Sequence, residues 1–153
     1  MQALNFLVFD YGIKRMGVAA GQTVTGTARP LNPMAMQNGH PDWNAIEVLL
    51  GEWKPAGVIV GLPLNMDGSA SDMTRRADKF RKRLHGRFAL PALAWDERLT
   101  SDAIKRIERA RGVTDFGQHS VDSQAAALIF QSWFDSLDNL ADWPMHSIAL
   151  PPQ

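Results

Sequence analysis

The stretch LNFLVFDYGIKRMGVAA occupies residues 4–20 and contains two apolar runs separated by a polar turn. The first run, residues 4–9, is rich in β-forming side chains and stops at Asp10 and Gly12, which is typical of a buried strand entering a turn. Residues 17–20 and 23–29 are also compatible with short strands, and glycines separate them. The beginning of the chain therefore predicts a three-stranded antiparallel meander.

Helices and further buried strands follow the meander. We expect a loop over residues 30–41, a helix over 42–53, a strand over 57–61, a loop over 62–71, a helix over 71–84, a strand over 89–95, and helices over 101–111 and 121–137. This order predicts an α/β fold in which the meander joins parallel strands connected by helices. Functional groups in such sheets gather beyond the carboxyl ends of the parallel strands.

The chain has 153 residues, the length of one compact domain, which we expect over residues 1–138 with an irregular C-terminal tail over 139–153. Cysteine is absent, which excludes disulfides, thiolate zinc sites and a cysteine nucleophile, so any metal must be bound by oxygen or imidazole. The N-terminus has no basic leader, and no apolar run approaches the roughly 18 residues of a membrane span. We therefore expect a cytoplasmic protein without membrane contact.

The formal charges sum to zero, but they are unevenly distributed. Residues 1–74 contain four basic and six acidic residues, which gives a charge of −2. Residues 75–111 contain twelve basic and five acidic residues, which gives +7, and residues 112–153 contain no basic and five acidic residues, which gives −5. Attraction to phosphate depends on local potential, which keeps nucleic acid as a candidate partner. A solvated face without a partner is the alternative. Aromatic residues are not interleaved with the basic ones, which disfavours a platform for stacking single-stranded bases.

Acidic residues stand where elements of the predicted sheet begin or end. Asp10 ends the first strand, Asp96 and Glu97 follow the strand at 89–95, and Asp122 lies in the first turn of the last helix. Carboxylates that converge need cations, and hard oxygen ligands suit Mg²⁺ or Mn²⁺. Two such ions can activate an attacking water and stabilise the leaving oxygen of a phosphodiester. Each acid also has a separate structural explanation: Asp10 in a turn, Asp96 and Glu97 in a loop, and Asp122 in the first turn of a helix, where it favours the helix dipole.

Four motifs resemble the signatures of the YqgF/RuvX family, in the family's order: DYGIKRMGVA at residues 10–19, VGLPLNMDGS at 60–69, DERLTS at 96–101 and VDSQAA at 121–126. The resemblance implies a ribonuclease-H-like fold over about residues 4–137. It also implies a nuclease that processes the 5′ end of pre-16S rRNA during ribosome biogenesis, with a Holliday-junction-resolvase-like DNA endonuclease as the alternative.

By position, the resemblance assigns catalytic and metal-binding roles to Asp10, Glu97 and Asp122, with Mg²⁺ or Mn²⁺ as the cofactor. It prefers Glu97 to Asp96 as the metal ligand, a choice that the residues alone leave open. The implied partners are structured RNA (pre-16S rRNA) or branched DNA. Both a monomer and a homodimer are compatible with the sequence.

Six further residues are candidate substrate contacts: Lys14, Arg15, Asn65, Gly68, Ser69 and Arg98. The first two lie in the turn after Asp10, where they can reach a phosphate or form an ordinary solvated turn. The next three lie in the loop over residues 62–71. The backbone amides of this loop can bind phosphate oxygens, or the loop can be a purely structural turn. Arg98 can contact phosphate or pair with Asp96. The family often has a basic residue a few positions before the third acid. His119 is the nearest candidate here, with either a surface or capping role or a role in proton transfer or phosphate contact.

Two other classes of function remain open. A non-catalytic RNA-binding assembly factor would use the basic segment while the acids serve structure. A phosphotransferase is suggested by the acidic-glycine turn after the first strand, although the chain lacks a Walker-type phosphate loop. If the nuclease interpretation is right, we expect the +7 segment to surround Glu97.

Overall fold

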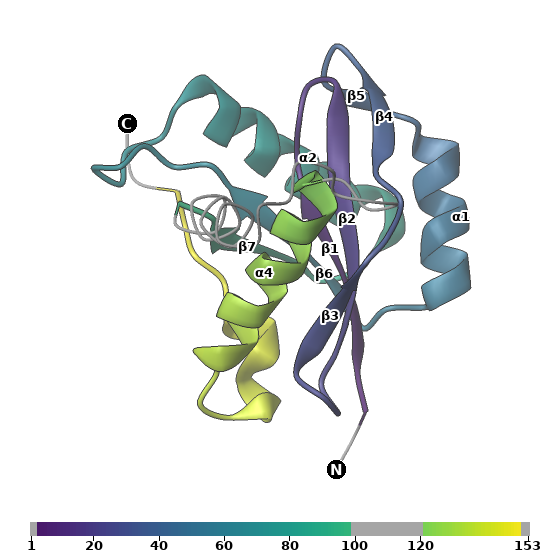
Figure 1. The fold of residues 1–153 in the computed structure, drawn as a ribbon, viewed down its shortest axis with the longest axis vertical. Coiled ribbons are helices and arrows are strands. Elements are labelled where there is room, and N and C mark those ends of the chain that lie inside the picture. The colour runs from purple at the N-terminus through teal and green to yellow at the C-terminus, as the bar shows by residue number, and fades with distance from the viewer. Residues whose placement is uncertain (1–2, 99–120, 151–153) are drawn as a thin grey trace, which may run out of the picture.

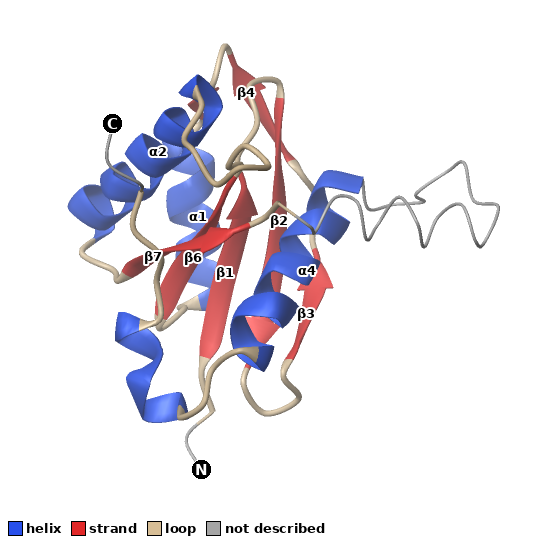
Figure 2. Ribbon diagram, turned by 90° about the vertical axis from the view of Figure 1, so that its left-hand side faces the viewer, coloured by secondary structure: helices blue, strands red, loops and turns tan. Residues whose placement is uncertain are grey.

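The computed structural model describes residues 3–98 and 121–150. Within them lies a seven-stranded mixed sheet, built from β1 (Asn5–Asp10), β2 (Arg15–Gln22), β3 (Thr27–Pro30), β4 (Met34–Gln37), β5 (His40–Pro41), β6 (Gly57–Leu62) and β7 (Ala92–Asp96). The strand order is β5-β4-β2-β1-β6-β7, and β3 also pairs with β2. Figure 2 shows β7, β6, β1 and β2 side by side. The first three strands are antiparallel, whereas β6 is parallel to both β1 and β7. The predicted meander and parallel strands are confirmed.

Helices cover both faces of the sheet (Figure 1). The helices α1 (Trp43–Trp53) and α2 (Asp72–Phe88) lie on one face, and α4 (Val121–Asp135) lies on the other. Side chains of a strand alternate between faces, so Leu7 and Phe9 of β1 pack toward α1 and α2, while Phe6 and Val8 pack against α4. The central strand β1 is therefore buried from both sides.

The segment 30–41, expected as a loop, contains the hairpin of β4 and β5, so that prediction was wrong. Asn38 and Gly39 form its turn, and both have positive φ, at 51° and 82°. This Asn-Gly pair favours the tight turn whose twist matches the flanking strands. Each strand is too short for an alternating apolar pattern, and the neighbouring prolines are typical of irregular backbone.

The other element boundaries shift by a few residues. The helix expected over 71–84 continues to Phe88, and Ala89, with φ 55°, ends it in the left-handed conformation. The following strand therefore starts at Ala92 rather than at residue 89. The helix expected over 101–111 lies outside the described residues.

Residues 139–150, expected as an irregular tail, contain a 3₁₀ helix (Leu140–Met145) and pack on the sheet. The ring of Trp143 lies 5.0 Å from that of Phe6, and the Ile148 amide donates a hydrogen bond of 2.9 Å to the Ala94 carbonyl. This segment therefore covers the free edge of β7. Among the described residues, no helix has the length and apolar character needed to cross a membrane.

We expect Gly17→Ala to lower the free energy of unfolding by about 1–3 kcal/mol, because a Cβ at Gly17 would clash with the backbone of Asp122 at the start of α4. Chemical denaturation measures the change. Gly86→Ala is the control: nothing lies within 4 Å of its Cβ position on α2, so it is expected to stabilise the protein by about 0.5–1 kcal/mol. The same effect from both substitutions would contradict the tight packing of α4 on β2.

Candidate active site

The acidic residues gather at the carboxyl edge of the parallel strands. Asp10 is the last residue of β1, and it pairs with Gly17 of β2 on one side and with Gly61 of β6 on the other. Glu97 directly follows β7, and Asp122 lies in the first turn of α4. The expectation that strand ends bring Asp10 and Glu97 together is met, because the parallel register of β1, β6 and β7 ends these strands at one edge of the sheet.

Two glycines make room for this arrangement. A Cβ at Gly61 would lie 2.7 Å from Glu97 Oε2, and a Cβ at Gly17 would clash with the backbone of Asp122. Side chains at either position would displace the acids that flank Asp10. Sequence reasoning gave these glycines no role, although a glycine inside a strand often marks a close approach of another chain segment.

Asp10 and Glu97 cannot both be ionised at neutral pH. Burial raises the pKa of Glu97 to about 10, and the negative charge of Asp10 and hydrogen bonding to it add to the shift. Burial also raises the pKa of Asp10 to about 6; hydrogen bonding with Glu97 opposes this, and the charge of Asp122 adds to it. Without a cation, the two carboxyls therefore hold one proton between them at pH 7.

One oxygen of this pair has no partner. Glu97 Oε2 is buried and forms no hydrogen bond to any residue that the structure describes. A buried acceptor that lacks a donor costs free energy, which a bound cation can remove. The donor set of carboxylate oxygens suits Mg²⁺ or Mn²⁺, so Asp10 and Glu97 fit such an ion.

The third acid stands apart from the other two. Asp122 Oδ2 lies 3.5 Å from Arg15 Nε, and the Asp122 side chain is 31% exposed. Across residues 3–98 and 121–150, no group of three acidic or histidine side chains is arranged to hold a metal ion. The structure thus brings Asp10 and Glu97 into contact, whereas Asp122 acts on Asp10 through its charge and pairs with a cation.

The three predicted contacts in the β6–α2 loop are bonded to one another. Asn65 Nδ2 donates to Ser69 Oγ at 2.9 Å, and the Gly68 amide donates to the Asn65 carbonyl at 2.8 Å. The Ser69 amide and hydroxyl both donate to Asp67, which lowers the pKa of that carboxyl. These residues build a compact turn in which Gly68 takes φ 87°.

Arg98 pairs with Asp96, one of its two expected roles. Its guanidinium donates to Asp96 Oδ2 from both Nε, at 2.8 Å, and Nη2, at 2.6 Å. Burial alone would raise the pKa of Asp96, but the hydrogen bonds and charge of Arg98 lower it below its usual value. Arg98 Nη1 also donates to the Met66 carbonyl at 3.3 Å, so Arg98 ties the β6–α2 loop to the end of β7.

The described helix of the basic segment, α2, does not surround Glu97 as expected. This helix lies on the face of the sheet opposite α4, so its cations are separated from Glu97 by the sheet. Lys14 is exposed in the turn after Asp10. His119 and residues 101–111 lie outside the described residues.

We expect the metal-free protein to lose stability as the pH rises. The folded state holds protons on Asp10 and Glu97 that the unfolded chain releases near its ordinary carboxyl pKa, so the free energy of unfolding falls from about pH 4.5 toward about pH 10. Glu97→Gln removes one of these protons, and its melting temperature in EDTA should therefore fall less steeply between pH 5 and 9 and exceed that of the wild type at pH 9.

Glu52→Gln, which changes an exposed acid of α1, is the control and should follow the wild-type curve. Parallel curves for the wild type and Glu97→Gln would contradict the shared proton.

Comparisons with known proteins agree with this geometry. The family model RuvX, described as Holliday junction resolvase, matches residues 4–136. A protein of Hahella chejuensis is 56% identical over 134 residues, which are 86% of this chain and 85% of that protein. A protein of Pseudomonas paraeruginosa is 53% identical over 128 residues, which are 83% of this chain and 89% of that protein. Both carry the name "Putative pre-16S rRNA nuclease".

Solved structures share the fold at low sequence identity. RuvC of T. thermophilus, in complex with a Holliday junction substrate, gives a TM-score of 0.55 at 13% identity and covers 86% of this chain and 94% of its own. Fowlpox virus resolvase, in complex with Holliday junction DNA, gives 0.53 at 13% identity and covers 89% of this chain and 100% of its own. The ribonuclease-H-like mixed sheet is confirmed. The family match spans the whole described sheet, and two relatives are identical to this chain at over half of the aligned residues. This chain therefore belongs to the RuvX family.

Proposed function

We propose that this protein is a metal-dependent nuclease that hydrolyses phosphodiester bonds in the 5′-end processing of pre-16S rRNA. The observation that carries the proposal is the pair of buried carboxyls, Asp10 and Glu97, at the carboxyl edge of the sheet, with one oxygen that lacks a partner. Membership of the RuvX family and the names of the relatives support a hydrolase acting on ester bonds of nucleic acid.

Asp10 and Glu97 are the proposed ligands of Mg²⁺ or Mn²⁺, and Asp122 is the third. A cation held by these carboxyls would replace the proton shared by Asp10 and Glu97 and could satisfy the unpartnered Glu97 Oε2. When bound, a divalent ion lowers the pKa of an attacking water and stabilises the leaving oxygen. Gly17 and Gly61 keep the acids in place, because larger side chains there would occupy their space.

Basic residues beside the acids are proposed to orient the substrate phosphate. Lys14 is exposed in the turn after Asp10 and free to reach a strand that approaches the sheet edge. Arg15 pairs with Asp122 at 3.5 Å while 65% of its side chain is exposed, so it can exchange that partner for a phosphate. Asn65, Gly68 and Ser69 of the β6–α2 loop, together with Arg98 after β7, are proposed to contact the substrate.

We expect Asp10→Asn and Glu97→Gln each to reduce Mg²⁺-dependent cleavage of a precursor 16S rRNA fragment by about 100-fold or more. The reason is that losing a metal ligand removes several kcal/mol of transition-state stabilisation. A gel assay of end-labelled RNA, with and without Mg²⁺, measures the rates. The control Glu47→Gln changes an exposed acid of α1 and should leave the rate within about twofold of the wild type.

Equal cleavage by the wild type and Asp10→Asn would contradict the proposal. RNA binding that survives Asp10→Asn without any metal-dependent cleavage would instead indicate a non-catalytic assembly factor. The family description as a Holliday junction resolvase favours branched DNA as the second candidate substrate. A four-way junction assayed with the same preparation therefore separates the two: faster cutting of the junction than of the RNA would support the resolvase.

A further inference from the structure

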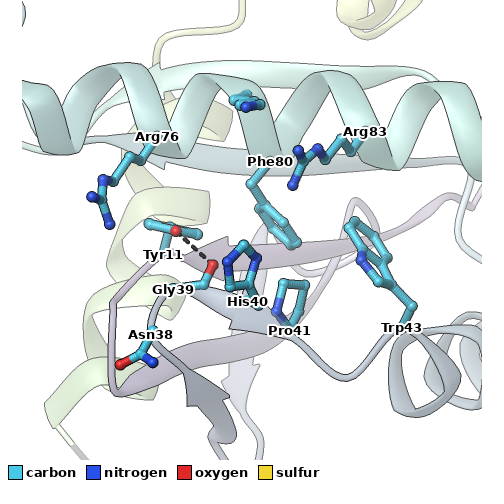
Figure 3. A pocket seen from close by; sticks show the side chains of 10 residues that line it. Tyr11, Asn38, Gly39, His40, Pro41, Trp43, Arg76, Phe80 and Arg83 are labelled. Carbon is cyan, nitrogen blue, oxygen red and sulfur yellow. Dashed lines mark hydrogen bonds between the residues drawn. The ribbon is translucent and has the colours of Figure 1, made fainter.

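An open groove lies between α2 and the hairpin of β4 and β5, on the face of the sheet opposite the acids (Figure 3). Its volume is about 290 Å³. Arg76, Lys79 and Arg83 of α2 line it. His40 of the hairpin lies across from Arg76 and Arg83. None of the described residues that line the groove is acidic.

The cations of α2 divide into two groups. Arg75, Arg81 and Lys82 pair with Asp72 or Asp78 of the same helix. Arg76, Lys79 and Arg83 are exposed, and none forms an ion pair with a described residue. Three uncompensated positive charges on one wall create a potential that attracts anions.

The spacing of these cations fits more than one phosphate. Arg76, Lys79 and Arg83 are three, four and seven residues apart, so they share one side of α2. At a rise of about 1.5 Å per residue they extend over about 10 Å of helix. A single phosphate group is too small to contact all three, whereas successive phosphates of a polynucleotide can do so.

The groove and the candidate active site lie on opposite faces of the sheet but are linked by consecutive residues of the chain. Tyr11, which lines the groove, follows Asp10 in the chain. The Tyr11 hydroxyl donates a hydrogen bond of 2.7 Å to the Gly39 carbonyl, and its ring lies 5.6 Å from that of Phe80 (Figure 3). Tyr11 thus joins the hairpin wall to α2 at the sheet edge where Asp10 ends β1.

We propose that Arg76, Lys79 and Arg83 bind the phosphates of one strand of the RNA substrate beyond the bond that is cleaved. This inference rests on the proposed nuclease function for its substrate. A strand that reaches Asp10 from the groove passes around the edge of the sheet at Tyr11. The groove therefore contributes to affinity and to placement of the substrate, and the acids on the other face act on the phosphodiester.

The test measures binding in EDTA, where no metal-dependent cleavage occurs. The probe is a fluorescein-labelled, unstructured oligoribonucleotide of about 20 nucleotides, followed by anisotropy over a range of salt concentrations. In R76Q/K79Q/R83Q, the slope of log K against log salt should become shallower by about 2, because each phosphate contact on a single strand contributes about 0.7. The matched control R29Q/R75Q/K82Q removes the same charge outside the groove and should retain the wild-type slope.

Cleavage kinetics supply a second readout. R76Q/K79Q/R83Q should raise KM while kcat stays within about twofold of the wild type, since the groove does not contact the reacting phosphate. Circular dichroism checks that both triple variants are folded. Equal slopes for the two triple variants would overturn the inference. The inference would also be overturned if R76Q/K79Q/R83Q lost binding to AMP but kept the wild-type affinity for the oligoribonucleotide.

The proposed function and this inference can fail separately. If the wild type cleaves RNA but the slope of R76Q/K79Q/R83Q is unchanged, the groove assignment is wrong and the nuclease stands. If the wild type cleaves no RNA but the slope becomes shallower only in R76Q/K79Q/R83Q, the groove assignment is supported as an RNA-binding site and the nuclease is wrong.

Discussion

Two carboxyls that cannot both be ionised impose the main constraint on this structure. Burial and the charge of Asp10 raise the pKa of Glu97 to about 10, so the metal-free protein keeps a proton where a nuclease would hold a cation. Strand register places the two acids at one sheet edge, and Gly61 leaves the space for Glu97 Oε2. The fold thus brings together charges that repel one another, and a divalent ion is the natural means of relieving that repulsion.

The sheet separates the acidic pair from the basic groove. Asp10 and Tyr11 are neighbours in the chain, yet Asp10 contacts Glu97 while Tyr11 lines the groove beside α2. Connections between parallel strands keep one handedness, which places α2 on the face shared with α1. The expectation that this basic helix would surround Glu97 was wrong for this reason, because charge counted along the sequence does not indicate the face of the sheet on which a helix lies.

Local sequence patterns predicted most of the fold. Apolar runs located β1, β6 and β7, and helical spacing located α1, because these signals come from neighbouring residues. The meeting of Asp10 and Glu97 also followed from strand ends that share one edge. The hairpin at Asn38 was missed because its strands are too short for a periodic pattern, although Asn-Gly is itself a turn signal.

Contacts between distant segments could not be predicted in this way. The pairing of Arg15 with Asp122 and the packing of α4 on Gly17 join residues over a hundred positions apart. The sequence likewise separates Trp43 from the basic helix, whereas the fold stacks it on Phe80 and places Arg87 4.2 Å from its ring centre. Such contacts depend on how the elements pack, and no local pattern records them.

A crystal structure of the protein soaked in Mn²⁺, with anomalous diffraction, shows directly whether Asp10 and Glu97 bind a divalent ion. If these two carboxyls bind the metal, an anomalous peak lies between Asp10 and Glu97, at about 2.2 Å from their oxygens, with Glu97 Oε2 among the ligands. Full anomalous data that show no peak there, with the two carboxyls still in direct contact at millimolar Mn²⁺, would contradict metal binding by this pair.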